Sequence, residues 1–165
     1  MHMLSNIIFY SLDKAIRQYR KLAQANIDRA GIAITIDQWL VLRVIQEHDD
    51  LTQTDIAERV LKDQASVARM ISLLLKAGLL AAEPLLHDGR RSRLRVSEEG
   101  LRTLDAVQPV VLNNRLIALD GLSEEDLALM RPMLERIYSN CVAASQTAAT
   151  AAPVITLEAS EQHSS

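Results

Sequence analysis

The stretch LTQTDIAERVLKDQASVARMISLLLKAG, residues 51–78, predicts two short helices joined by a tight turn. Thr52 is placed to cap the first helix and Asp63 to cap the second, because both side chains can accept a hydrogen bond from a free backbone N–H. Gly78 follows the second helix, where a left-handed residue often ends a helix. Residues 79–96 predict two short strands around a turn at 87–91. This order of elements is typical of the winged helix-turn-helix, an arrangement that reads DNA.

The helix predicted over 64–77 has two different sides. At about 100° per residue, one narrow arc collects apolar side chains that should face the core; these are Val67, Met70, Ile71 and Leu74. The opposite side is small, polar and basic, which suits close approach to base edges. The residues that we expect to contact DNA from this helix are Gln64, Ala65, Ser66, Arg69, Ser72 and Lys76. An ordinary amphipathic surface helix would show a similar division.

The hairpin adds a second basic element, which would form the wing. Its tip holds Arg90 and Arg91, and along the second strand Arg93 and Arg95 alternate with Leu94 and Val96. Arginine at such a tip can enter a minor groove or bind phosphate, so we predict DNA contacts from Arg90, Arg91 and Arg93. A structural alternative is an ion pair between Asp88 and Arg90 that braces the tip.

The flanking sequence predicts helices that support this lobe. Apolar residues recur every three or four positions from residue 4 to Gly31 and again in two helices between 98 and about 145, the last of which starts after Gly121 with Ser123 as its cap. Ser97 is placed to cap the second of these segments, and Thr35 or Asp37 to cap a helix between 35 and 48. We therefore expect one mostly α-helical domain over 1–165, with a winged helix-turn-helix lobe at 35–97. Residues 146–165 are rich in Ala, Thr, Ser and Gln, which predicts a disordered tail.

Composition and charge narrow the class of protein. Aromatic residues make up 3% of the chain, which predicts an aliphatic core, and the net charge is −3. Residues 62–95 nevertheless carry seven Lys or Arg against three acidic residues, so local charge favours nucleic acid. No apolar run reaches the roughly 18 residues that would cross a bilayer. With one cysteine and no secretion signal, the sequence predicts a cytoplasmic protein without membrane contact.

Other functions find little support in the sequence. There is no phosphate-binding loop, nucleophile motif or spacing of histidines that suits a metal, so we expect no enzyme activity, cofactor or metal. Cys141 lies on the apolar stripe of the last helix, which favours a buried or interface cysteine over a redox sensor. Tyr19 and Trp39 are candidates for an effector pocket, although core packing is the simpler explanation. A winged helix used only for protein–protein contact also remains open.

Several segments together resemble the MarR family of bacterial transcription regulators. They are the helices around DQWLVL (37–42) and LTQTDIAE (51–58), the stretch SVARMISLL (66–74) before KAGL (76–79), and DGRR (88–91) before LRVSEEG (94–100). The resemblance spans residues 4–144 and implies a homodimer that binds a pseudo-palindromic site in double-stranded DNA, with Arg90 as the wing arginine. The terminal helices would form the dimer, and a small, often aromatic effector would release DNA from a repressor. Leu73 and Ala81-Ala82 depart from the family, where charged residues are common, and this places more of the binding on the wing.

Overall fold

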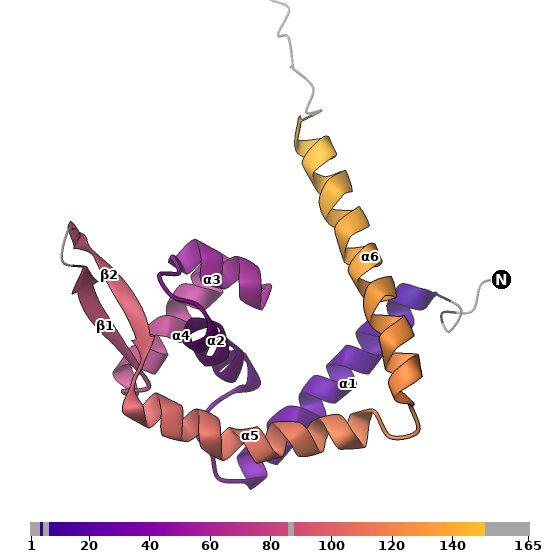
Figure 1. Cartoon of the computed structure of the whole chain (residues 1–165), viewed down its shortest axis with the longest axis horizontal. Helices are drawn as coiled ribbons and strands as arrows, with labels where there is room; N and C mark the ends of the chain where they lie inside the picture. The colour runs from indigo at the N-terminus through magenta and orange to yellow at the C-terminus, as the bar shows by residue number, and fades with distance from the viewer. Residues whose placement is uncertain (1–3, 5–6, 86–87, 151–165) are drawn as a thin grey trace, which may run out of the picture. The chain divides into compact units, whose positions relative to one another are not determined.

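The computed structural model describes residue 4, residues 7–85 and residues 88–150, with side chains for all of these except 85, 88–91 and 148–150. Within these ranges the chain forms six α-helices and one antiparallel hairpin (Figure 1). The elements in order are α1 (Ile8–Arg29), α2 (Ile36–Glu47), α3 (Gln53–Val60), α4 (Gln64–Lys76), β1 (Leu80–Leu85), β2 (Asp88–Val96), α5 (Glu98–Ala118) and α6 (Glu124–Thr150). The predicted mostly helical winged helix-turn-helix fold is confirmed.

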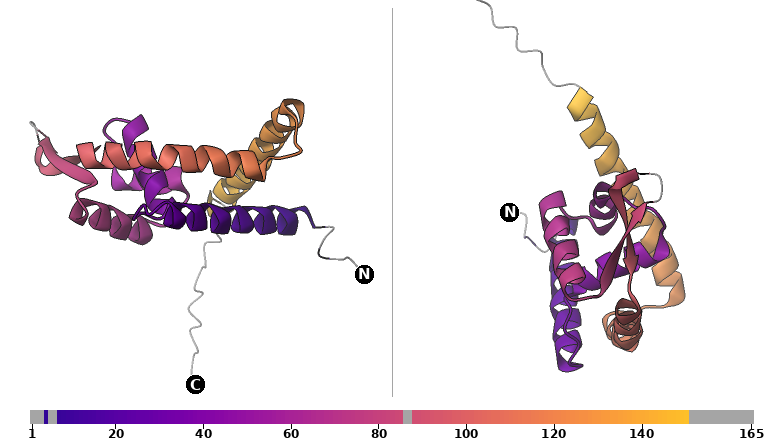
Figure 2. Two further views of the ribbon diagram at one scale, coloured as in Figure 1. Left: turned by 90° about the horizontal axis from the view of Figure 1, so that it is seen from below. Right: turned by 90° about the vertical axis from the view of Figure 1, so that its left-hand side faces the viewer.

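Two compact units make up the chain. Residues 1–120 contain α1 to α5 and the hairpin, and residues 121–165 contain α6. Because α6 is the only helix of the second unit among the described residues, that unit has no other element against which α6 could bury an apolar stripe. In the first unit, α1 packs against α5, while α2, α3 and α4 pack on one another (Figure 2).

Polar side chains begin the helices where the sequence predicts caps. The Oγ1 atoms of Thr35 and Thr52 accept from the N–H groups of Gln38 and Asp55, and in each pair the side chain of the second residue accepts from the N–H of the first. Asp63 accepts from the N–H of Ser66, and Ser97 from that of Gly100. Each of these bonds satisfies an N–H that the helix itself leaves free. Thr35 is therefore the cap of α2, and Asp37 is left for another role.

The turn between α3 and α4 is tight because Leu61 adopts the left-handed conformation, with φ of +56°. The N–H of Lys62 then bonds the carbonyl of Ala57 at 3.1 Å, which closes the end of α3. At the end of α4, Gly78 has φ of +72°, and the N–H of Leu79 bonds the carbonyl of Leu74 at 2.9 Å. Gly78 thus ends the helix as predicted and turns the chain into β1.

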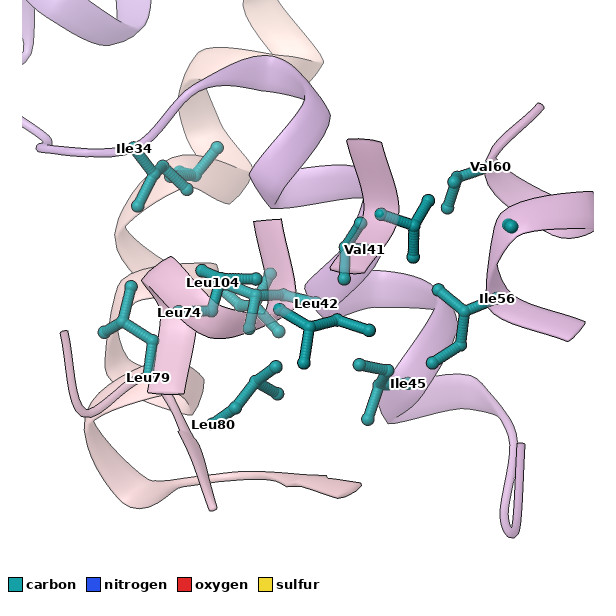
Figure 3. Packing of buried hydrophobic residues seen from close by; sticks show 14 of the residues in the cluster. Ile34, Val41, Leu42, Ile45, Ile56, Val60, Leu74, Leu79, Leu80 and Leu104 are labelled. Atoms are coloured by element: carbon teal, nitrogen blue, oxygen red, sulfur yellow. The ribbon is translucent and has the colours of Figure 1, made fainter. Parts of the chain in front are cut away.

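Every element of the first unit contributes to one aliphatic core (Figure 3). Ile27 of α1, Leu42 of α2, Ile56 of α3 and Leu74 of α4 are almost completely buried. The other buried core residues are Ile34, Val41, Ile45, Ala57, Val60, Val67, Ile71, Leu79, Leu80, Leu104 and Val107. None of them is aromatic, in agreement with the composition.

The start of α5 lies directly on the chain that leads into the wing. The N–H of Ser97 bonds the carbonyl of Leu79 at 3.1 Å, and its hydroxyl donates to the carbonyl of Gly78 at 2.6 Å. Gly100 is buried against this segment, and a Cβ atom added there would lie 2.2 Å from the Leu79 carbonyl oxygen. Glycine is thus required for α5 to approach the base of the wing this closely.

Two predicted boundaries need correction. The first helix begins at Ile8 rather than at residue 4, and α6 continues to Thr150, past the point at which the sequence predicts disorder. Alanine is the best helix former, and the alanines around 143–149 extend the helix. Residues 151–165, also predicted to be disordered, lie outside the described residues. No helix among the residues that the structure describes is long and apolar enough to cross a membrane.

Candidate nucleic-acid interface

The second helix of the helix-turn-helix, α4, has one buried side and one free side. Val67, Ile71 and Leu74 are buried, as predicted. On the opposite side, Gln64, Ala65, Arg69, Ser72 and Lys76 are all exposed. Among the described residues, no hydrogen bond or ion pair engages the side chain of Arg69 or Lys76. Five of the six predicted contacts on this helix are thus accessible to a ligand.

The sixth, Ser66, is half-buried and takes part in the helix cap. Its hydroxyl donates to one carboxylate oxygen of Asp63 at 2.6 Å, and its N–H donates to the other at 2.8 Å. The hydroxyl bond, together with the backbone bond, holds the pKa of Asp63 below its usual range. A negative charge therefore stands at the N-terminus of α4, where a free helix end would attract phosphate. Asp63 thus accepts from an N–H group that would otherwise be free to bind phosphate at this end of the helix.

The wing is a regular antiparallel pair near its base. Leu80 lies opposite Val96, Ala82 opposite Leu94, and Pro84 opposite Ser92, followed by an irregularity before Leu85. Leu94 and Val96 pack against the core. Across the strands, Arg95 Nη1 lies 3.2 Å from both carboxylate oxygens of Glu83. The backbone of Arg90 and Arg91 belongs to β2, but their side chains lie outside the described residues, and so does the suggested pair between Asp88 and Arg90.

Arg93 does not extend freely toward a ligand. Its Nη2 atom donates to Asp49, and its Nε atom lies 3.3 Å from a carboxylate oxygen of Asp50. Both acids belong to the loop between α2 and α3, where His48 Nε2 also lies 3.3 Å from Arg59 Nη1. The sequence predicts Arg93 as a DNA contact, whereas the structure engages it within the protein. Among the described residues, no group of three or more His, Cys, Asp or Glu side chains is arranged to hold a metal ion.

A second charged cluster joins α1 to the helix-turn-helix. Asp37, at the start of α2, accepts from Arg20 of α1, and Lys62 Nζ of the turn before α4 lies 3.2 Å from its other oxygen. Partial burial would raise the pKa of Asp37, but the hydrogen bonds and charges of Arg20 and Lys62 outweigh it and leave the pKa lowered. Asp37 is therefore ionised at neutral pH and connects α1, α2 and the turn before α4.

The two candidate effector residues, Tyr19 and Trp39, are half-buried on α1 and α2. Trp39 packs against the core, as the simpler explanation predicts. Its indole Nε1 atom is nevertheless buried and has no hydrogen-bond acceptor among the described residues. Asn114 of α5, 1% exposed, accepts from Asn26 of α1 at 2.6 Å, but the same part of the chain offers its Nδ2 no acceptor. A buried donor without an acceptor is costly.

Large apolar side chains remain exposed on three helices. In α1 they include Ile8, Phe9 and Ile16, and in α5 they include Leu112, Leu116 and Ile117. In α6 the exposed set is Leu129, Met130, Met133, Leu134 and Tyr138. Cys141 of α6 is exposed in the single chain, so it is not a core residue, and its predicted place at an interface stays a prediction. Apolar side chains in such numbers are typical of surfaces that another protein covers.

Sequence patterns missed the residues that act across elements. Arg20 and Asp37 are 17 positions apart, and Asp49 and Arg93 are 44 apart, so no helical or strand period connects them. The clue that the sequence does contain is the Asp49-Asp50 pair, since two adjacent carboxylates favour a nearby cation. Asn114 gave no signal, because a single polar residue in a helix of mixed composition is usually exposed.

The chain is similar in sequence to known transcription regulators. A sequence model of the MarR family matches residues 31–91, which include α2, α3, α4 and part of the wing. The transcriptional repressor IacR of Pseudomonas putida is 24% identical over 134 residues, which cover 80% of this chain and 78% of IacR.

Two solved structures extend the likeness to most of the chain. The crystal structure of a probable transcriptional regulator from Pseudomonas aeruginosa is 26% identical, with a TM-score of 0.72 over 82% of this chain and 99% of that one. BpsR of Bordetella bronchiseptica, whose DNA binding is regulated by 6-hydroxynicotinic acid, has the same fold. It is 19% identical, with a TM-score of 0.75 over 84% of this chain and 97% of that one.

Proposed function

Because this chain belongs to the MarR family of DNA-binding transcription regulators, we propose that it is a cytoplasmic repressor that binds a pseudo-palindromic operator as a homodimer. A small effector, aromatic by analogy with the ligand of BpsR, releases it from DNA. The likeness to IacR, named as a repressor, supports repression rather than activation. The members of the family are DNA-binding regulators and not enzymes.

The observation that carries the proposal is the exposed side of α4. It combines two unpaired cations, Arg69 and Lys76, with small side chains at Ala65 and Ser72. Small residues let a helix backbone approach the floor of the major groove, and a guanidinium can donate two hydrogen bonds to guanine. We propose Gln64, Ala65, Ser66, Arg69, Ser72 and Lys76 as the major-groove contacts and Arg90 and Arg91 as contacts of the wing.

The apolar side chains on α1, α5 and α6 support the homodimer. A two-fold dimer uses the same surface on both copies, so a single chain leaves that whole surface exposed. Leu116 and Leu129 are 74% and 61% exposed, which is unusual for leucines in a stable monomer. We propose that a second copy covers these helices and that Cys141 belongs to this surface. Burial there would protect its thiol from oxidants, which argues against a redox sensor.

The unpaired indole N–H of Trp39 supports the effector. A ligand that carries a carboxylate or carbonyl oxygen would supply the acceptor that the described residues do not offer. We propose that Trp39 and Tyr19 contact the effector. A winged helix that binds only proteins would have no use for unpaired cations on the side of α4 that faces away from the core.

The operator is tested by selecting bound duplexes from a random DNA library with the full-length protein. We expect an inverted repeat whose half-sites are centred about one helical turn apart, with two chains bound per duplex. The logarithm of the affinity should fall with the logarithm of salt concentration by about 0.9 per phosphate contacted. Enrichment of a single, unrepeated site would contradict the dimer, and no enrichment together with salt-independent binding would contradict the function.

The effector is tested through Trp39, which is the only tryptophan in the chain. Titration with aromatic carboxylates, beginning with benzoate and 6-hydroxynicotinate, should change its fluorescence at the same concentrations that release the selected duplex. Release of DNA without a change in fluorescence would place the effector elsewhere. The variant Trp39→Phe removes the indole donor, and we expect it to need about tenfold more ligand for release, the scale of one lost hydrogen bond.

A further inference from the structure

We propose that Arg93 is a positioning residue that holds the wing against the loop between α2 and α3, and that it does not contact DNA. Arg93, Asp49 and Asp50 together form what we call the wing clamp. The inference rests on the proposed DNA binding, because its purpose is to present the tip of the wing at a fixed place. The alternating basic residues of the second strand led us to expect a DNA contact from Arg93, and this inference assigns it a different role.

The wing clamp joins one guanidinium to two carboxylates. Arg93 uses Nη2 for Asp49 and Nε, at 3.3 Å, for Asp50, so neighbouring N–H groups of one guanidinium meet the carboxylates of consecutive residues. The Arg93 side chain is 30% exposed, whereas those of Asp49 and Asp50 are 89% and 67% exposed. The arginine is thus the central member, and the acids approach it from the solvent side.

The loop depends on the clamp for its own conformation. Asp50 is left-handed, with φ of +55°, a conformation that costs free energy for a residue other than glycine. The neighbouring carboxylates of Asp49 and Asp50 also repel one another unless a cation lies between them. Arg93 supplies that cation from β2. Thr52, two residues after Asp50, caps α3, so the clamp joins the wing to the loop that leads into the helix-turn-helix.

Around Ser92 and Arg93, side-chain packing alone does not hold the wing in one orientation. A cleft of about 530 Å³ separates β2 from α3 and α4; its walls include Leu51, Gln53, Ile71, Ser92 and Leu94. A hairpin of two strands is marginally stable by itself and takes its orientation from what it contacts. The base of the hairpin packs on the core, and beyond it the wing clamp supplies ion pairs between β2 and the loop that precedes α3.

Charge also argues against DNA contact by Arg93. One cation between two carboxylates leaves the wing clamp with a net charge of −1, which repels phosphate. Arg69 and Lys76, by contrast, have no acidic partner among the described residues. A residue that binds phosphate would have to leave both acids first, at the cost of two ion pairs.

The test is a comparison of Arg93→Ala with the double variant D49N/D50N on the selected operator. We expect both to weaken binding by roughly three- to tenfold, the scale of two exposed ion pairs, with the salt dependence unchanged. If Arg93 instead bound phosphate, Arg93→Ala would lower the salt slope by about 0.9. D49N/D50N would then strengthen binding and raise the salt slope, because it frees the arginine to bind phosphate. That opposite sign would overturn the proposal.

A control and a second measurement separate this inference from the proposed function. Arg43→Ala breaks an exposed ion pair with Glu47 on α2, away from the wing, and should leave DNA affinity unchanged. Amide hydrogen exchange of the free protein needs no DNA at all. Arg93→Ala and D49N/D50N should both speed exchange in residues 49–53 and 92–94, whereas Arg43→Ala should not. Unchanged exchange in both clamp variants would overturn the inference even if the protein binds its operator normally, and faster exchange would support it even if no operator were found.

Discussion

Replacing Gly100 with alanine should lower the free energy of unfolding by about 3 kcal/mol, the upper range for forcing extra atoms into a packed site. In an exposed helix the same change raises stability by about 1 kcal/mol, because alanine is the better helix former. At Gly100 the sign reverses, since the new methyl group would lie 2.2 Å from the Leu79 carbonyl oxygen and 2.6 Å from Val96 Cγ1. The first of these atoms is backbone and cannot rotate away.

Urea denaturation followed by circular dichroism measures this loss. Asp105→Ala, one and a half turns further along α5 at an exposed position, is the matched control and should change stability by less than about 0.5 kcal/mol. A Gly100→Ala protein as stable as the parent would show that α5 can move off the Leu79 segment without cost. The core and the wing would then be less closely connected than the structure indicates.

Replacing Arg69 with alanine should weaken operator binding by about 1–3 kcal/mol, the usual worth of a bidentate contact between arginine and guanine. The side chain is exposed on α4, and the described residues offer it no partner, so no folding interaction is lost with it. Stability should therefore remain that of the parent while affinity falls. Fluorescence anisotropy with the selected duplex gives the dissociation constant.

The choice of DNA distinguishes a base contact from a phosphate contact. If Arg69 reads a base, its loss should affect the operator and leave binding to a scrambled duplex nearly unchanged. A phosphate contact would weaken both duplexes alike and reduce the salt slope. Arg102→Ala, which removes an arginine of α5 already paired with Glu99, is the control and should leave affinity unchanged. Parental binding by Arg69→Ala would mean that another side of the lobe faces DNA.

The features that the sequence predicts well are local ones. Thr52, Asp63 and Ser97 cap their helices because a cap depends on residues only three positions apart. The two sides of α4 follow from the helical repeat, with Val67 buried and Arg69 exposed. Family resemblance and periodicity together are thus enough to place the helix-turn-helix.

The features that sequence did not predict depend on contacts between distant elements. Asp37 is placed well for a cap, but the structure gives that role to Thr35 and turns Asp37 toward Arg20 and Lys62. Arg93 has the alternation of a DNA-binding strand, and only the fold shows the acids beside it. Charged residues have long side chains and little periodicity, so their partners emerge only when the chain is folded.

The carboxylate of Asp63 has a consequence for how the protein searches a chromosome. Most encounters are with random DNA, where binding is electrostatic and independent of sequence. A negative charge at the end of α4 repels phosphate. If α4 enters the major groove as we propose, this repulsion should weaken binding to random DNA and help the protein to leave sequences that are not its operator.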